Sequence, residues 1–179
     1  MRIAIALLIL FASMQLAAAQ IIESNQELGD LQLHDQADRR KGADALDGSV
    51  VRRNDHIRRQ RVLTLLREGR VRSSNDFYSA AMVFQHGESP DDAKLAHSLA
   101  VVSATMNPDN TSARWLAAAA WDRYMLRLKR PQWYGTQYST DEATGLVTLY
   151  TVDETAVTDE QRLQEGVPTL AHARARAKP

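Results

Sequence analysis

Residues 89–129, SPDDAKLAHSLAVVSATMNPDNTSARWLAAAAWDRYMLRLK, decide the fold, because they predict two helices joined by a short turn. Ser89 is placed to cap the first helix, and Pro90 occupies the first helical position, where a missing N–H does no harm. The turn Asn-Pro-Asp-Asn at 107–110 leads into a second helix at 111–129, which a following proline stops. We expect the first helix to bury one stripe of residues: Leu95, Ala96, Leu99, Ala100, Val102 and Met106.

Two further helices are predicted before this stretch. Asn54 is placed to cap a helix that ends at Gly69, and Ser74 is placed to cap another that ends at Gly87. Alanine fills positions 117–120 of the last helix, and small residues let neighbouring helices approach closely. No repeat with the period of about 34 residues that indicates tetratricopeptide repeats is found. We therefore predict four helices arranged as two α-hairpins.

After the fourth helix the pattern changes from helical to β-type. Residues 132–139 and 146–152 are rich in residues that favour strands, and Gly145 between them can adopt the positive φ of a turn. Thr158 then begins a short helix through a capping box with Gln161. The predicted fold class is mainly α (α+β): a four-helix α-hairpin bundle followed by a β-hairpin and a short C-terminal helix.

The first nineteen residues, 1–19, have the composition of a secretory signal peptide. Arg2 supplies a positive charge, residues 3–12 form an unbroken apolar run, and Ala17–Ala19 offers the small residues that signal peptidase requires. The run is too short for a membrane span, which needs about 20 apolar residues. We expect cleavage after about Ala19 and no stable membrane insertion afterwards. Because the chain has no cysteine, secretion indicates a bacterial periplasm or exterior.

The mature chain is expected to contain one folded domain. Removing nineteen residues from 179 leaves 160, which is enough for a single hydrophobic core. Residues 20–53 are polar and lack a sustained period, so we predict a flexible or weakly helical arm there. A single helical domain then covers 54–170, with the β-hairpin at about 132–152. A basic tail at 171–179 is expected to fray.

Charge is balanced over the whole chain, with 22 basic and 22 acidic residues. No global field therefore directs the protein to nucleic acid or to a membrane. Arginines gather within residues 52–72, without the interleaved aromatic side chains that stack on bases. Acidic residues gather within 141–165. The two regions either lie near each other or are separately solvated; the alternative is that the arginines form an anion-binding patch.

Several motifs occur together between residues 77 and 170: Gln85-His86-Gly87, Asp122-Arg123, Gln132-Trp133-Tyr134-Gly135-Thr136-Gln137 and Asp159–Arg162. In these motifs the chain resembles a bacterial exported or cytosolic family of unknown function with the signature QHG…DR…QxYGTQ. The resemblance covers a little over half of the chain, and its most distinctive part is the segment QWYGTQ. It implies a shared architecture and a shared site, and it implies no reaction.

The QWYGTQ segment carries the groups of a polar site. Tyr134, Thr136 and Gln137 supply a phenol, a hydroxyl and an amide around Gly135, which lets a ligand or another backbone come close. We predict these three side chains as binding residues for a small polar ligand. The alternative is a hairpin that packs on the helices and buries the same face with its hydroxyls satisfied.

Asp122 and Arg123 follow each other on the fourth predicted helix. Arg123 lies near the buried side of that helix, where a charge is costly unless it is paired. One interpretation is a structural ion pair with Asp55 or Asp153. The other interpretation is an arginine clamp, because a planar guanidinium suits the oxygens of a carboxylate or a phosphate.

His86 is the best candidate for a general base, because imidazole titrates near neutral pH. We predict Asp122 as a catalytic residue beside it, with Tyr134 as the alternative partner. The position of His86 at a helix C-terminus also has a simpler explanation, since the helix dipole stabilises an imidazolium there. His97 could approach His86 if the helices pack antiparallel, but the spacing matches no ligand motif. We therefore predict no metal and no other cofactor.

Known catalytic motifs are absent from the sequence, including Gly-x-Ser-x-Gly, His-Glu-x-x-His and a glycine-rich phosphate loop. Three classes of function remain. The first is a periplasmic binding or interaction module, with a polar site at the helix–hairpin junction for a small polar ligand or a protein partner. The second is a hydrolase- or lyase-type enzyme that uses His86 as base. The third is a structural protein whose signature residues only fix the hairpin to the helices.

Overall fold

The computed structural model describes residues 22–40, 46–141 and 143–177, so the predicted signal peptide at 1–19 lies outside the described residues. The predicted class is confirmed, because the described residues are mainly helical and contain an antiparallel β-hairpin. In this part of the chain no helix is long and apolar enough to cross a membrane. The elements are α1 (Gln26–Ala37), α2 (Gly48–Arg67), α3 (Ser74–Gln85), α4 (Pro90–Met106), α5 (Thr111–Arg127), β1 (Tyr138–Thr140), β2 (Val147–Leu149), α6 (Asp159–Gln164) and α7 (Leu170–Arg176).

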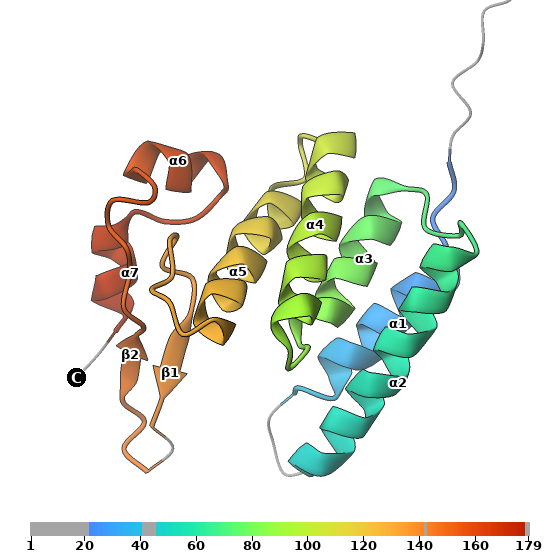
Figure 1. Ribbon diagram of the computed structural model, residues 1–179, viewed down its shortest axis with the longest axis horizontal. Coiled ribbons are helices and arrows are strands. Elements are labelled where there is room, and N and C mark those ends of the chain that lie inside the picture. The colour runs from blue at the N-terminus through green and yellow to red at the C-terminus, as the bar shows by residue number, and fades with distance from the viewer. Residues whose placement is uncertain (1–21, 41–45, 142, 178–179) are drawn as a thin grey trace, which may run out of the picture.

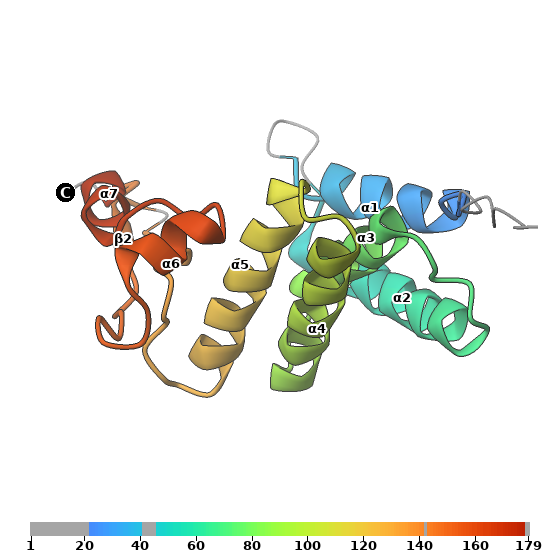
Figure 2. The same ribbon diagram turned by 90° about the horizontal axis from the view of Figure 1, so that it is seen from above.

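The helices lie side by side largely in chain order (Figure 1). α4 packs between α3 and α5, and α1 and α2 both contact α3 at one end of this row. Figure 2 shows the hairpin, α6 and α7 beyond α5 at the other end. The short loops on either side of α4 make α3, α4 and α5 antiparallel neighbours, as predicted. Alanines allow close approach among the larger core residues: Ala80, Ala81, Ala96, Ala100, Ala117 and Ala120 lie among Leu28, Val62, Leu65, Val83, Phe84, Leu99 and Leu116.

Side-chain caps fix the starts of α3 and α4. The hydroxyl of Ser89 accepts from the N–H of Asp92, and the Asp92 carboxylate accepts from the N–H of Ser89, with Pro90 in the first turn as predicted. α3 begins in the same way, with Ser73 and Asp76 as the reciprocal pair, one residue before the predicted cap. These two helices therefore begin where local sequence directs them.

Residues 20–53 were predicted as a flexible or weakly helical arm, but the described part of that range is mostly helical and packs on the other helices. Residues 26–37 form α1, and α2 begins well before the predicted start because Asp47, and not Asn54, is its cap. Leu28 is fully buried, and so is the carboxylate-bearing Asp35. Hydrophobic periodicity does not detect α1, because its buried residues include the charged Asp35 as well as Leu28.

The buried stripe of α4 differs from the prediction at one end. Ala96 is buried as expected, but Val102 is 39 % exposed and Met106 is 46 % exposed. Ala93 and Ser103 are buried in their place. Because α4 lies between two helices, its contact faces require small side chains, and the larger residues near its C-terminus point elsewhere.

The β-hairpin is shorter than predicted. Tyr138 pairs with Leu149 and Thr140 pairs with Val147. Gly145 has a φ of 70°, as expected for the turn. Residues 132–137 do not extend β1, because many of their backbone groups bond to side chains rather than to the facing strand. The predicted first strand is therefore mostly a loop.

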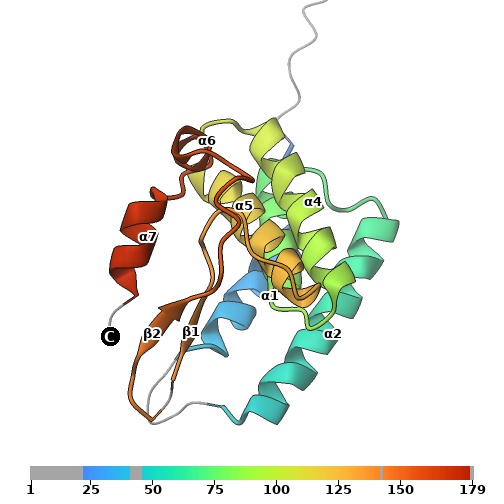
Figure 3. The ribbon, with the colours of Figure 1, turned by 60° about the vertical axis from the view of Figure 1, so that its left-hand side comes forward.

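The C-terminal part contains one helix more than predicted. The capping box of Thr158 and Gln161 is present at the start of α6. The predicted fraying tail at 171–179 is wrong for its described residues, which continue α7. Ala173 on α7 is 2 % exposed, and a Cβ placed on Gly135 would lie 3.5 Å from its Cβ. Gly135 therefore lies close against α7, and Figure 3 shows α7 beside the hairpin.

Candidate functional site

The buried carboxylate of Asp122 organises the junction between α5 and the hairpin. Its Oδ1 accepts from the N–H groups of Trp133 and Tyr134, at 2.7 and 2.9 Å. Its Oδ2 accepts from the N–H and the hydroxyl of Thr136, at 2.9 and 2.8 Å. Burial raises the pKa of the Asp122 carboxyl, and these four hydrogen bonds oppose the rise. Asp122 therefore fixes the QWYGTQ loop to α5.

Two other buried polar side chains complete this attachment. The amide of Gln132 donates to two backbone carbonyls of the hairpin at 3.0 and 2.9 Å, and it accepts from the N–H of Gln137 at 2.9 Å. The guanidinium of Arg162 donates to the carbonyls of Trp133 and Tyr134, at 2.8 and 3.2 Å. Neither Gln132 nor Arg162 was predicted as a site residue. Both belong to the sequence motifs on which the family resemblance rests, and those motifs were the signal that could have identified them as site residues.

The three predicted binding residues have different surroundings. Thr136 is engaged by Asp122, and the amide of Gln137 donates to the Ala119 carbonyl at 3.3 Å and to the Thr136 hydroxyl at 3.0 Å. Gln137 also lines a pocket, and Tyr134 is not among the described residues that line it. Burial raises the pKa of the Tyr134 hydroxyl. The structure thus places Gln137, and neither of the other two, at a solvent-reaching surface hollow.

That pocket has a volume of about 360 Å³ and lies between the C-terminal half of α5 and the hairpin. The arrangement of these elements can be followed in Figure 3. Its lining combines two cations with phenol, amide and aliphatic groups: Arg123, Leu126, Arg127, Gln137, Tyr138 and Tyr150. We call this the arginine pocket.

Arg123 lacks the internal ion pair that was considered for it. Its Nε is buried, and within the described residues it meets no hydrogen-bond acceptor. Asp55 instead pairs with Arg39 and with Arg58 of α2, and Asp153 accepts from the turn that follows it. Burial lowers the pKa of the Arg123 guanidinium, and the positive charges of Arg127 and Arg39 lower it further. A nearby anion would therefore stabilise this guanidinium.

His86 contacts Asp35 and not Asp122. Its Nδ1 lies 2.9 Å from Oδ2 of Asp35, and the other carboxylate oxygen of Asp35 lies 3.0 Å from the guanidinium of Arg39. The predicted pair of His86 and Asp122 is therefore not assembled, since all four hydrogen bonds described for Asp122 go to the QWYGTQ loop. Asp35 was missed because it lies within the range predicted as an arm. The same buried charge cluster also contains Asp38, Asp55 and Arg58.

The charge cluster borders the arginine pocket. Arg127 donates to the carbonyl of Gly87 at 3.1 Å, and Gly87 follows His86 in the chain. Arg39 of the cluster lies close enough to Arg123 to affect its pKa. The C-terminal ends of α3 and α5 thus bring an imidazole and several guanidinium groups into one region of the molecule.

Arginines within residues 52–72 pair with acids inside the helical part. Arg58 bonds Asp38 at 2.8 Å, and a guanidinium nitrogen of Arg61 bonds Glu27 at 2.9 Å. Both acids belong to the segment before α2 and were not considered as partners for these arginines. The segment therefore contributes to packing between α1 and α2.

The described residues contain no group of three or more histidine, aspartate or glutamate side chains placed to hold a metal ion. His97, considered as a second ligand, has its Nδ1 2.9 Å from the carbonyl of Ala117. Its ring centroid lies 5.2 Å from that of Trp121. His97 therefore belongs to the packing between α4 and α5.

The geometry as a whole defines a row of helices, a hairpin fixed by buried polar groups, and a pocket lined by Arg123, whose buried Nε has no acceptor among the described residues. Comparisons of the chain with family models, with curated proteins and with solved structures found no match.

Proposed function

We propose that the protein is an exported binding module that holds an anionic group of a small polar ligand in the arginine pocket. The observation that carries this proposal is Arg123, whose buried Nε has no acceptor among the described residues. A carboxylate or phosphate in the pocket would supply both the missing acceptor and the missing counter-charge.

The other groups of the pocket support the same ligand chemistry. The planar guanidinium of Arg123 can bond two oxygens of one anion, and Arg127 adds a second positive charge. The hydroxyl of Tyr150 and the amide of Gln137 provide neutral hydrogen-bonding groups around it. Leu126 forms an apolar wall, so the ligand carries an anionic group on a partly apolar body.

Binding is tested with inorganic phosphate and citrate, added to protein in a buffer that contains neither phosphate nor carboxylate. Both anions should raise the melting temperature of the wild type and should leave that of Arg123→Met unchanged. The matched control is Arg53→Met, because Arg53 is an exposed arginine on α2. Its response to the anions should equal that of the wild type.

The stability of Arg123→Met without anion provides a second test. Replacing this partly buried, unpaired guanidinium by an apolar side chain should stabilise the protein by about 1 kcal/mol. A variant that is less stable than the wild type would mean that Arg123 has an internal partner, which contradicts the proposal. A wild type that does not respond to either anion also contradicts it and leaves the structural role of the signature residues.

Export is a separate part of the proposal and rests on the N-terminal sequence. We propose Sec-dependent cleavage after about Ala19, which places the mature protein in a bacterial periplasm or outside the cell. Mass spectrometry of the full chain expressed in a bacterium tests this. A periplasmic protein that begins near Gln20 supports export, and an uncleaved cytoplasmic chain contradicts it.

The contact between His86 and Asp35 favours a second candidate, a hydrolase- or lyase-type enzyme with His86 as base. A carboxylate that holds one imidazole nitrogen orients the other toward a substrate. In this version the arginine pocket binds a charged group of the substrate. A panel of phosphate and carboxylate esters tests it: His86→Ala should remove turnover and keep the thermal response to citrate. Equal turnover by His86→Ala would contradict a role as base.

A further inference from the structure

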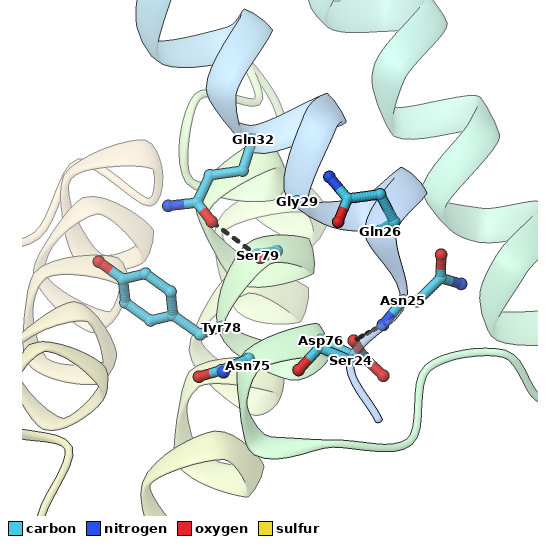
Figure 4. A pocket seen from close by; sticks show the side chains of 9 residues that line it. All are labelled: Ser24, Asn25, Gln26, Gly29, Gln32, Asn75, Asp76, Tyr78 and Ser79. Carbon is cyan, nitrogen blue, oxygen red and sulfur yellow. Dashed lines mark hydrogen bonds between the residues drawn. The ribbon is translucent and has the colours of Figure 1, made fainter. Parts of the chain in front are cut away.

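A second pocket, of about 290 Å³, lies between the start of α1 and the first turns of α3 (Figure 4). Asp76 is the charged residue among its described lining residues. Both oxygens of this carboxylate are already engaged: it accepts from the N–H groups of Asn25, Arg72 and Ser73, at 2.6, 2.9 and 2.9 Å. The pocket therefore presents hydrogen-bonding groups without a free charge.

Three neutral side chains have hydrogen-bonding capacity left for a ligand. Gln32 uses its carbonyl oxygen to accept from the hydroxyl of Ser79 at 2.8 Å, which leaves its NH₂ group available. Among the described residues, the side chain of Asn75 and the hydroxyl of Tyr78 have no hydrogen-bond partner. In Figure 4 the amide nitrogen of Gln32 and the hydroxyl of Tyr78 point to the same side of the pocket.

Tyr78 also lines an adjoining hollow that contains an exposed tryptophan. This hollow has a volume of about 210 Å³ and includes Trp115 and Thr111 at the start of α5. Trp115 is 42 % exposed, although indoles are usually largely buried. The other two tryptophans, Trp121 and Trp133, pack against each other with centroids 4.8 Å apart. We call the two hollows that share Tyr78 the Tyr78 groove.

We propose that the Tyr78 groove binds a neutral saccharide. A pyranose ring has an apolar face of C–H groups, which stacks on an aromatic ring such as that of Trp115. Its hydroxyls both donate and accept, as do the side chains of Asn75 and Tyr78, and the NH₂ group of Gln32 donates. No cation that could bind an anion is among the described residues that line the groove. An uncharged sugar could hydrogen-bond through its hydroxyls to the polar side chains and stack its apolar face on Trp115.

This site is independent of the arginine pocket. Trp115 and Arg123 are eight residues apart on α5, which corresponds to about 12 Å along the helix axis. The groove also takes residues from α1, from the segment before it and from α3, with Gly166 after α6, whereas the pocket takes its other residues from the hairpin. The proposal for the groove therefore stands or fails separately from anion binding.

Isothermal titration calorimetry with chitotetraose, cellotetraose and maltotetraose tests the proposal. At least one of these neutral tetrasaccharides should bind saturably to the wild type. Trp115→Ala and Asn75→Ala should each weaken its affinity about tenfold or more, which corresponds to about 1.4 kcal/mol. Tyr78→Phe keeps the ring and should also weaken binding. Leu163→Ala, at an apolar side chain that is 60 % exposed, should bind as the wild type does.

The outcomes that overturn the proposal are distinct. Absence of saturable binding by all three sugars overturns it. Binding that persists unchanged in Trp115→Ala or in Asn75→Ala places the sugar elsewhere and also overturns it. Asn75 is exposed, so its variant keeps the fold and the test remains valid even if a variant of a more buried residue does not.

Discussion

Replacing Asp122 by alanine should release the hairpin from α5. The change removes the acceptor of three backbone N–H groups and one hydroxyl at once. A buried donor left without its acceptor costs about 1–3 kcal/mol. Three backbone donors at the lower value give a loss of about 3 kcal/mol. Burial of the carboxylate, which raises the pKa of Asp122, also costs free energy, and the alanine variant avoids this cost. We therefore use the lower value.

The free energy of unfolding is measured by urea titration, followed by tryptophan fluorescence. Trp133 lies in the released loop and contacts Trp121 on α5, so its emission reports the loop directly. Asp122→Asn should cost less, about 1–2 kcal/mol, because its amide oxygen can still accept from Trp133 and Tyr134. Asp109→Ala removes an exposed carboxylate in a turn and should change stability by less than about 0.5 kcal/mol.

Hydrogen exchange of the backbone N–H groups in the loop gives an independent readout. In Asp122→Ala the amides of Trp133, Tyr134 and Thr136 should exchange much faster than in the wild type. A stability loss below about 1 kcal/mol, together with unchanged protection of these amides, would refute the role assigned to Asp122.

Three further changes test the helix ends. Burial acts to raise the pKa of Asp76, but hydrogen bonds from backbone N–H groups outweigh it, so the pKa lies below 3.8. Asp76 therefore stabilises the fold above about pH 4, and acid urea titrations should show a smaller stability loss below that pH in Asp76→Asn. Gly69→Ala places a Cβ in open space at a φ of 64° and should cost about 1 kcal/mol in thermal unfolding. Gly87→Ala places a Cβ against Asp92 and should cost about 2–3 kcal/mol, more than Gly69→Ala, so equal effects of both glycine variants would contradict this clash.

Local sequence rules predicted the elements whose hydrogen bonds are local. The caps at Ser89 and Thr158 and the turn at Gly145 act within a few residues, and the structure contains all three. The loop at 132–137 escaped prediction because its partner, Asp122, lies on another element. The strand-like composition of this segment cannot reveal that the Asp122 carboxylate, in place of the facing strand, accepts hydrogen bonds from its backbone N–H groups.

Helix α1 shows a second limit of sequence patterns. Its buried positions include both Leu28 and Asp35, so the usual contrast between apolar and polar faces is lost. The candidate site was affected in the same way. Arg123 and Gln137 could be singled out from their type and position, whereas Asp35 could be recognised as the partner of His86 only from the structure.

The order of the helices along the chain also has a kinetic consequence. α3, α4 and α5 are joined by loops of only a few residues, and each packs against its neighbour in the chain. Most of the contacts between these helices can therefore form soon after the helices themselves have formed. Folds dominated by such local contacts fold quickly. The hairpin joins this row through hydrogen bonds between the Asp122 carboxylate and residues that lie 11–14 positions away in the chain. We therefore expect both the helical row and its junction with the hairpin to form from segments that are close in the chain, and the arginine pocket to form when the hairpin docks on α5.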